Sequence, residues 1–425
     1  MSGARIPGQR PLVPVPTIVS WNLTRRCNLA CRHCYLDAVR RRHTSSDELN
    51  TGDALSVIAQ VAEVAPGAML VLTGGEPLLR ADLVTLVRHA AACGLAPVIG
   101  TNGSLLNERR ARALKDAGAT GVGVSLDSAD AAFHDEVRGV RGAWRAATRG
   151  AAAARRAGLA LLLHTTLFEQ NRQDLAALAN LAETLGAMAL NFFFLVCTGR
   201  GETQTDLSGA AYEDILARIV ELQRSRPQLI IRARCAPYLR RLLGLRAGES
   251  AEGYGAWSSA CLAGRGYLRI TPEGRVTPCP YIPAVIGDLR QAALREIWER
   301  HPVLIRLRAE LPEGKCGACD FRYSCGGCRA RALAQHGDVM AEDPQCAYVT
   351  APGIPPEAPS APESAAVTWD PAAQALLERI PAFVRATVKT RLEQYASSEG
   401  TGCITANFMS AHRPRLPFSE WRKLS

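Results

Sequence analysis

Three cysteines lie close together near the start of the chain, in the segment RRCNLACRHCY. They are Cys27, Cys31 and Cys34. Thiolates bind soft metals, and a structural zinc site would need a fourth ligand nearby. His33 and His43 are candidates, but His33 directly precedes Cys34, which is awkward for a shared tetrahedral site. A [4Fe–4S] cluster can instead be held by three cysteines, which leaves its fourth iron open to an exogenous ligand.

The composition indicates a globular protein of more than one domain. The chain has 425 residues, of which 47% are hydrophobic, and no apolar run long enough to span a bilayer. Because its first residues, MSGARIPGQRPLVPVP, have no apolar signal-peptide core, we expect a cytoplasmic protein. The cytosol keeps thiols reduced, so the 14 cysteines indicate metal rather than disulfides. The net charge of +10 fits a solvated basic surface or an anionic small substrate, and nucleic acid is possible on charge alone.

The elements that position the cysteines are predicted to be strands and helices that alternate along the chain. Apolar, β-rich runs are expected to form strands at 17–24, 68–75, 96–103, 121–127, 159–168 and 187–196. Segments of helical length lie between them, at 53–65, 82–93, 107–117, 143–157 and 173–185. This alternation predicts an α/β fold with right-handed βαβ units and a parallel sheet. Six units are too few for a closed eight-stranded barrel, so we expect an open six-unit barrel rather than a flat doubly wound sheet.

Polar and glycine-rich motifs follow three of the predicted strands. They are LTGGEP, GTNG and SLDS. Each falls at the carboxyl end of its strand, where parallel α/β folds assemble their sites. We therefore expect these motifs to share one site with the cysteine loop.

This alternation of predicted strands and helices ends at about residue 205. Helices are predicted at 208–226 and 237–245, followed by a hairpin in GYLRITPEGRVTPCPY. The domains are expected to be an N-terminal extension, a barrel, linker helices with a cysteine-rich domain, a Pro-rich linker and a small helical C-terminal domain. Their predicted bounds are 1–16, 17–205, 206–350, 351–366 and 367–425.

The C-x3-C-x2-C spacing after a first strand resembles the signature of the radical S-adenosylmethionine (SAM) enzymes. The resemblance implies a partial (βα)6 barrel in which SAM binds the open iron of a [4Fe–4S] cluster. Cleavage of SAM would then give a 5′-deoxyadenosyl radical. The resemblance also implies a flavodoxin- or ferredoxin-type electron donor.

Other motifs of the barrel carry the same resemblance. TGGEP is similar to the family's Gly-Gly-Glu-Pro motif, in which glycines admit the methionyl group and Glu76 accepts from its ammonium. Ser125, Asp127 and Asn102 match positions that contact the ribose and carboxylate of SAM, and Arg138 is a weaker carboxylate candidate. The implied SAM-binding set is Gly74, Gly75, Glu76, Pro77, Asn102, Ser125 and Asp127.

A second cysteine set resembles the SPASM extension of many radical SAM maturases. By family pairing, one auxiliary [4Fe–4S] cluster would be held by Cys316, Cys319, Cys325 and Cys346. The other would be held by Cys261, Cys279 and Cys328, with either an open iron or Cys235 as the fourth ligand. Two zinc sites are the alternative, because C-x2-C pairs suit zinc equally.

The resemblance leaves two substrate classes open. LVCTGRG, CLAGRG and CGGCRARALAQHGDVMAEDPQC look most like the radical SAM enzymes of heme d1 and of the siroheme-dependent heme pathway, which modify tetrapyrrole side chains. Arg200 and Arg265 would then clamp ring carboxylates, although a solvated surface or contact with the SAM carboxylate explains them nearly as well. Residues 376–405 resemble the small C-terminal domain of light-independent protochlorophyllide reductase subunits. The alternative is a peptide maturase, disfavoured because the residues before the first strand leave no room for a peptide-recognition domain.

A few residues stay outside these assignments. Cys93 lies in an apolar helix and is expected to be a core residue. Cys197 ends the sixth strand, where a substrate-facing role is open. His164 is interpreted as a structural histidine, with a substrate contact as the alternative.

Overall fold

The computed structural model describes most of the chain: residues 13–38, 45–196, 198–203, 207–245, 260–350, 367–380, 385, 388–389, 392–393, 395–397 and 399–412. His43, Cys197 and the predicted linker at 351–366 lie outside the described residues. Within the described part, no helix combines the length and the apolar character that crossing a membrane requires.

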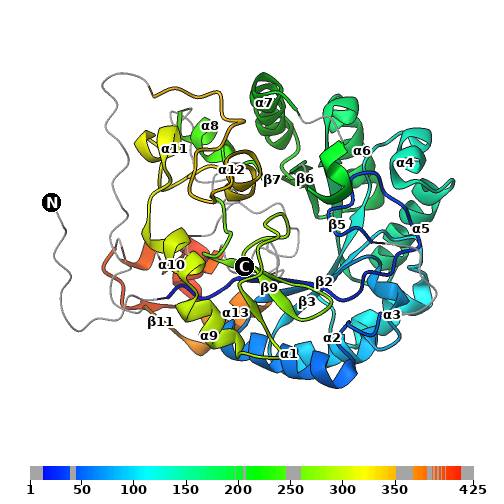
Figure 1. Cartoon of the computed structure of the whole chain (residues 1–425). Helices are drawn as coiled ribbons and strands as arrows, with labels where there is room; N and C mark the ends of the chain where they lie inside the picture. Colours follow the sequence, from blue (N-terminus) through cyan, green and yellow to red (C-terminus); the bar gives the residue numbers. More distant parts are fainter. Residues whose placement is uncertain are drawn as a thin grey trace.

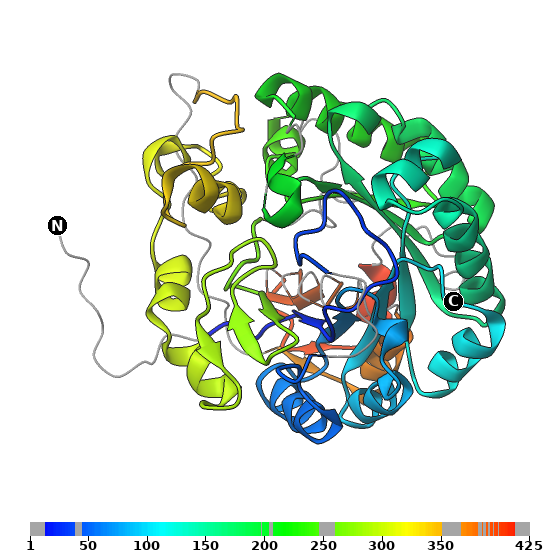
Figure 2. The ribbon, with the colours of Figure 1, turned by 45° about the vertical axis from the view of Figure 1, so that its right-hand side comes forward.

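One ten-stranded sheet organises the chain, in the order β10-β9-β8-β1-β2-β3-β4-β5-β6-β7. Its first seven strands run in parallel and in chain order. They are β1 (Ile18–Asn22), β2 (Met69–Thr73), β3 (Ala96–Thr101), β4 (Gly121–Ser125), β5 (Ala160–Leu167), β6 (Ala189–Phe194) and β7 (Ile230–Arg234). The sheet curves into an open barrel with helices on its outer face (Figures 1 and 2). The predicted α/β partial barrel is confirmed.

Amphipathic helices cover the sheet because each turns an apolar stripe toward it. In α1, for example, the Asn50 side chain caps the first turn by accepting from Asp53 N, and Val57, Ile58 and Val61 are buried. The barrel helices are α1 (Thr51–Val64), α2 (Leu83–Ala92), α3 (Glu108–Asp116), α4 (Ala131–Arg138), α5 (Ala143–Arg156), α6 (Leu175–Leu185) and α7 (Gly209–Ser225). Of these, α4 had not been predicted.

The sheet continues beyond residue 205. β7 adds a seventh parallel strand beside β6, and the predicted hairpin, β8 (Tyr267–Ile270) with β9 (Arg275–Thr277), extends the other edge because β8 pairs in parallel with β1. The remaining elements of this region are η3 (Gly199–Thr203), α8 (Leu239–Leu245), β10 (Gly287–Asp288), α9 (Leu294–Arg300), α10 (Pro302–Ala309), α11 (Gly314–Ala318) and α12 (Arg329–His336). The cysteine-rich region therefore shares a sheet with the barrel, and the domain boundaries stay predictions.

The C-terminal segment packs against the start of the last barrel strands. Its elements are β11 (Thr368–Trp369), α13 (Pro371–Glu378), β12 (Cys403–Ile404) and α15 (Ala406–Ala411). Its apolar residues share a buried cluster with Leu162, Ala189 and Ile230 of β5, β6 and β7. In Figure 2 the orange and red C-terminal elements lie behind the centre of the barrel. The segment thus covers the end of the barrel opposite the polar loops.

Candidate active site

The loop that carries Cys27, Cys31 and Cys34 is fixed on three sides. The loop after β2 bonds to its start, since Gly75 N donates to Thr24 O at 2.7 Å and Glu76 N donates to Arg26 O at 2.8 Å. The end of α4 bonds to its middle, where Arg32 N donates to Val137 O at 3.0 Å. The Arg200 guanidinium reaches it from η3, with Nε 3.0 Å from Cys31 O. The three thiols are therefore held on a preorganised loop.

A buried ion pair lies beside this loop. Arg138 Nε is 2.7 Å from Asp127 Oδ2, and Arg138 Nη1 is 3.7 Å from Cys31 Sγ. Burial raises the pKa of the Asp127 carboxyl, but the Arg138 guanidinium, together with His33, His134 and a backbone hydrogen bond, lowers it to about 2. His33 directs Nε2 toward the same carboxylate, 3.7 Å away. This candidate for a fourth zinc ligand thus faces Asp127.

The glycines of TGGEP allow two loops to cross in contact. A Cβ on Gly75 would lie 2.2 Å from Arg26 O, and one on Gly74 would lie 2.7 Å from Thr24 O. Gly74 also has φ +142°, which L side chains rarely adopt. Any side chain here would push the loop away from the cysteines.

Glu76 is fully buried and bonded within the protein. Its carboxylate accepts hydrogen bonds from Leu78 N at 3.0 Å, Thr101 Oγ1 at 2.8 Å and Asn102 N at 2.9 Å. Asn102 in turn directs Nδ2 toward Cys27 Sγ, 3.9 Å away. Glu76 therefore ties the loops after β2 and β3 together next to Cys27. Its predicted contact with the SAM ammonium stays a prediction.

Replacement of Glu76 by alanine should weaken SAM binding at least tenfold and lower the free energy of unfolding by about 1–3 kcal/mol, because buried donors lose their acceptor. Anaerobic calorimetry with SAM and thermal unfolding measure the two effects. Glu63→Ala, an exposed carboxylate on α1, is the control and should change neither. Loss of SAM affinity without loss of stability would instead indicate direct contact between the carboxylate and SAM. Unchanged SAM affinity in Glu76→Ala would show that TGGEP forms a structural turn and does not take part in SAM binding.

A cavity of about 400 Å³ extends from the cysteine loop through the barrel interior. Its lining includes seven of the ten residues predicted to form the cluster and SAM sites of the barrel: Cys27, Cys31, Cys34, Gly74, Gly75, Asn102 and Ser125. The other three, Glu76, Pro77 and Asp127, do not line it. The volume is in the range of small-molecule sites.

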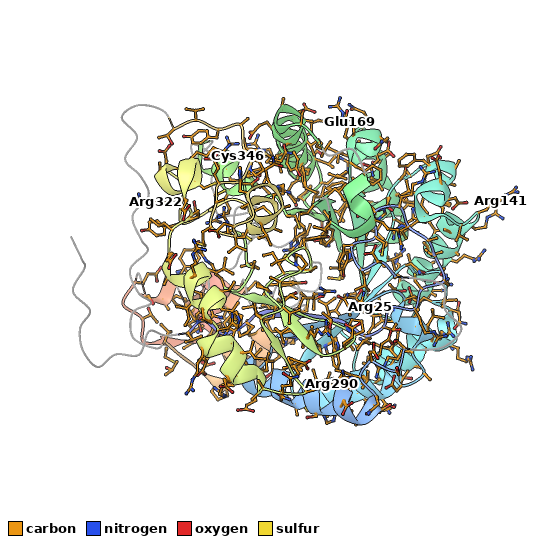
Figure 3. The ribbon with its side chains drawn as sticks, viewed as in Figure 1. Arg25, Arg141, Glu169, Arg290, Arg322 and Cys346 are labelled. Carbon is orange, nitrogen blue, oxygen red and sulfur yellow. The ribbon has the colours of Figure 1, made fainter. Side chains whose placement is uncertain are left out.

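Eight further cysteines form two groups. The inner group is Cys235, Cys261, Cys279 and Cys328, whose thiols interact electrostatically with one another and all line the cavity. The outer group is Cys316, Cys319, Cys325 and Cys346, connected by interactions of the same kind. Cys346 lies near α8 and α11, beside the barrel rather than in it (Figure 3). The structure brings together the same sets of cysteines as the predicted pairing, with Cys235 beside the inner one, and the clusters that they would hold stay a prediction.

The outer group depends on a glycine turn. Gly326 and Gly327 both have φ near +70°, and a Cβ on Gly327 would lie 2.9 Å from Cys316 Sγ. Phe321 N donates to Cys319 Sγ at 3.4 Å. The CGGC sequence is therefore needed both for the turn and for the space beside a thiol.

The thiols of each group are neighbours but do not converge on a point. Among the described residues, no three His, Cys, Asp or Glu side chains lie close enough to hold a single metal ion.

Comparison with known proteins identifies the chain. Residues 21–182 match the model of the radical SAM superfamily, and residues 261–328 match that of an iron–sulfur cluster-binding domain, SPASM. The AdoMet-dependent heme synthase of Methanosarcina barkeri is 38% identical over 344 residues, which cover 78% of this chain and 97% of that protein. The chain is a radical SAM enzyme with a SPASM domain.

Other relatives place this radical SAM enzyme near tetrapyrrole proteins. The pre-heme d1 synthase of Dinoroseobacter shibae is 33% identical over 359 residues, covering 80% of this chain and 87% of that protein. Residues 369–413 match the model of the proto-chlorophyllide reductase 57 kD subunit.

Among solved structures, Streptococcus suis SuiB bound to its precursor peptide has a similar fold. Its TM-score is 0.64 at 16% identity, over 79% of this chain and 76% of that one.

The arginines that face the radical SAM enzyme's cavity differ in part from those predicted. Arg265 does not line it, because its Nε donates to Leu307 O at 2.7 Å. Arg200 lines it but also donates to loop carbonyls. Two further arginines, Arg232 and Arg234, line the cavity from β7 and were not among the predicted residues. The alternation in IIRAR was the available signal, since it places both side chains on one face.

His164 also lines the cavity, which favours a substrate contact over the structural role expected for it. Its ring packs 5.3 Å from the ring of Phe193. Burial lowers the pKa of His164 to about 4, so the imidazole is neutral near pH 7. In the register of the sheet it stands between Ser125 and Asn191, which in turn pairs with Arg232. These four side chains form one polar row across β4 to β7.

Proposed function

We propose that this radical SAM enzyme removes or oxidises propionate or acetate side chains of a tetrapyrrole. The observation that carries the proposal is the cavity itself, which is lined by the cysteine loop, by the inner group and by Arg232 and Arg234. The heme synthase and pre-heme d1 synthase relatives supply the substrate class. A tetrapyrrole with several carboxylates suits a site with several guanidinium groups.

The residues present fit a SAM-binding cluster. Three thiols lie on one loop, and the glycines of TGGEP, which line the same cavity, let the loop after β2 pack directly against the cysteine loop. Cys27, Cys31 and Cys34 would hold the cluster, which with bound SAM supplies a 5′-deoxyadenosyl radical for hydrogen abstraction. Arg138, which is paired with Asp127, would bind the SAM carboxylate, and Ser125 and Asn102, which line the cavity, would donate or accept hydrogen bonds along the cofactor.

Cys235 is proposed as the fourth ligand of the inner group. It is a non-glycine residue with φ +58°, a conformation that costs free energy and persists where the surroundings require it. Its thiol interacts with those of Cys261 and Cys328, and its carbonyl accepts from Arg331. A cluster held by this group would supply an electron acceptor at the cavity wall. Such an acceptor is required when a propionate is lost as CO2 and leaves a vinyl group, because one electron must then leave the substrate.

The protein's own residues bind and orient the substrate. Arg232 and Arg234 would hold carboxylates that do not react, and the neutral His164 and Asn191 would contact the edge of the macrocycle. Apolar lining from Val71, Val98 and Leu162 would exclude water from the reacting carbon. Binding and hydrogen abstraction would thus occur in one cavity.

The test is product analysis with the reconstituted full-length enzyme under anaerobic conditions. Iron-coproporphyrin or didecarboxysiroheme, added with SAM and a reductant, should accelerate formation of 5′-deoxyadenosine and lose mass as carboxyl-derived fragments. If neither compound binds or changes, the proposal is wrong. The PqqA peptide cyclase of Xanthomonas euvesicatoria, 32% identical over 352 residues, makes conversion of a co-encoded short peptide the alternative result.

A further inference from the structure

A buried charged pair lies between the inner and outer cysteine groups. Arg331 of α12 and Asp343 are 4% and 0% exposed. Arg331 Nε is 3.3 Å from Asp343 Oδ1. Neither side chain lines the cavity. The pair therefore has no direct contact with substrate or SAM to explain it.

Asp343 contacts one cysteine of each group. Its backbone N–H donates to Cys316 Sγ of the outer group at 3.3 Å. Its Oδ2 accepts from the backbone N–H of Cys328, in the inner group, at 2.5 Å. Two cysteines assigned to different clusters are thus hydrogen-bonded to the same residue.

Arg331 extends this connection to a second inner cysteine. Its Nη2 donates to the carbonyl of Cys235, and its Nη1 donates to the Tyr212 hydroxyl at 3.0 Å. The guanidinium also lies over the rings of Tyr212 and Tyr238, at 5.0 and 5.6 Å from their centroids. These contacts fix a positive charge beside the inner group.

We propose that Arg331 and Asp343 are positioning residues that couple the two auxiliary sites, and that their charges act in opposite directions on the auxiliary reduction potential, Arg331 raising it and Asp343 lowering it. Reduction adds negative charge to a cluster, so a nearby cation favours it and a nearby anion opposes it. Both charges are buried, where water screens them little. The hydrogen bond from Asp343 N to Cys316 Sγ adds to the outer site, because N–H donors to cysteine sulfur favour the reduced state.

This inference rests on both cysteine groups holding clusters but on no particular substrate. The experiment is a redox titration followed by electron paramagnetic resonance, on reconstituted full-length enzyme without tetrapyrrole. Asp343→Asn should move an auxiliary midpoint potential to a more positive value. Arg331→Met should move it to a more negative value. A purely structural role would not give opposite signs.

Asp338→Asn is the matched control. It makes the same charge change five residues before Asp343, at an exposed carboxylate paired with Arg306, and should leave both potentials unchanged. Asp343→Glu and Arg331→Lys keep the charges and should restore values close to those of the wild type. Loss of iron from both auxiliary sites in Asp343→Asn, with rescue in Asp343→Glu, would also support the coupling.

The proposal is overturned if both variants keep their clusters and their potentials are unchanged or shift in the same direction. Because no tetrapyrrole is present, this failure would leave the proposed function standing. Conversely, failure to convert a tetrapyrrole would leave the titration result intact.

Discussion

Replacement of Cys31 by alanine is expected to abolish reductive cleavage of SAM. A cluster site that loses one of three cysteine ligands cannot keep its open iron positioned for SAM. Arg138 would keep its ion pair with Asp127 and lose only the contact to Cys31 Sγ, so the surrounding loop should stay folded. Iron should fall from about twelve to about eight atoms per chain if three [4Fe–4S] clusters are present. Chromatographic assay of 5′-deoxyadenosine and iron analysis measure the two quantities.

Cys93→Ala is the matched control for this variant. Cys93 is the C-terminal cap of α2 and packs against the main core, away from both cysteine groups and the cavity. It should keep SAM cleavage and iron content. Loss of all iron in Cys31→Ala would show that the three sites are not independent. Full replacement of iron by zinc in the wild type would contradict the cluster assignment itself.

The barrel could be predicted from the sequence because its signals are local. Strands β1 to β6 are short apolar runs, and each is followed by a segment long enough to form a helix that returns the chain to the start of the next strand. The cysteine pairing could be predicted only from a family resemblance, since spacing alone does not say which thiols meet. Cys235 was left undecided for that reason. Its position depends on a left-handed turn after β7 that the sequence RARCAP does not signal, because cysteine rarely adopts positive φ.

The features that could not be predicted from the sequence depend on contacts between distant segments of the chain. β8 joins β1 across about 250 residues, so no local pattern could place the cysteine-rich region on the barrel's own sheet. The hydrogen bonds of Glu76 could not be predicted from the sequence for a similar reason. Its motif suggests a ligand contact, which stays a prediction. Two of its three hydrogen-bond donors, Thr101 Oγ1 and Asn102 N, come from the end of β3, which only the fold brings to it, whereas the third, Leu78 N, is two residues away.

Substitution of Arg234 by methionine is expected to weaken tetrapyrrole binding by about 10- to 150-fold, as loss of a charge-assisted hydrogen bond worth about 1.5–3 kcal/mol requires. Arg234 lies on the cavity wall next to the inner group and is less buried than Arg232, so its loss should disturb the fold less. Methionine keeps much of the side-chain length and removes the charge. Titration of the porphyrin absorption band with enzyme gives the dissociation constant.

A comparison of two ligands makes this prediction specific to carboxylate recognition. Iron-coproporphyrin with its four free carboxylates should bind Arg234→Met more weakly than it binds the wild type. Its tetramethyl ester should bind both proteins equally, because the ester has no carboxylate charge for Arg234 to neutralise. Arg224→Met, on the exposed face of α7, should leave both affinities unchanged. If the acid and the ester both bind Arg234→Met more weakly than the wild type, and by the same factor, then Arg234 shapes the cavity and does not bind a carboxylate. In that case the polar row of Ser125, His164, Asn191 and Arg232 becomes the better candidate for substrate recognition, because it crosses the same cavity without depending on Arg234.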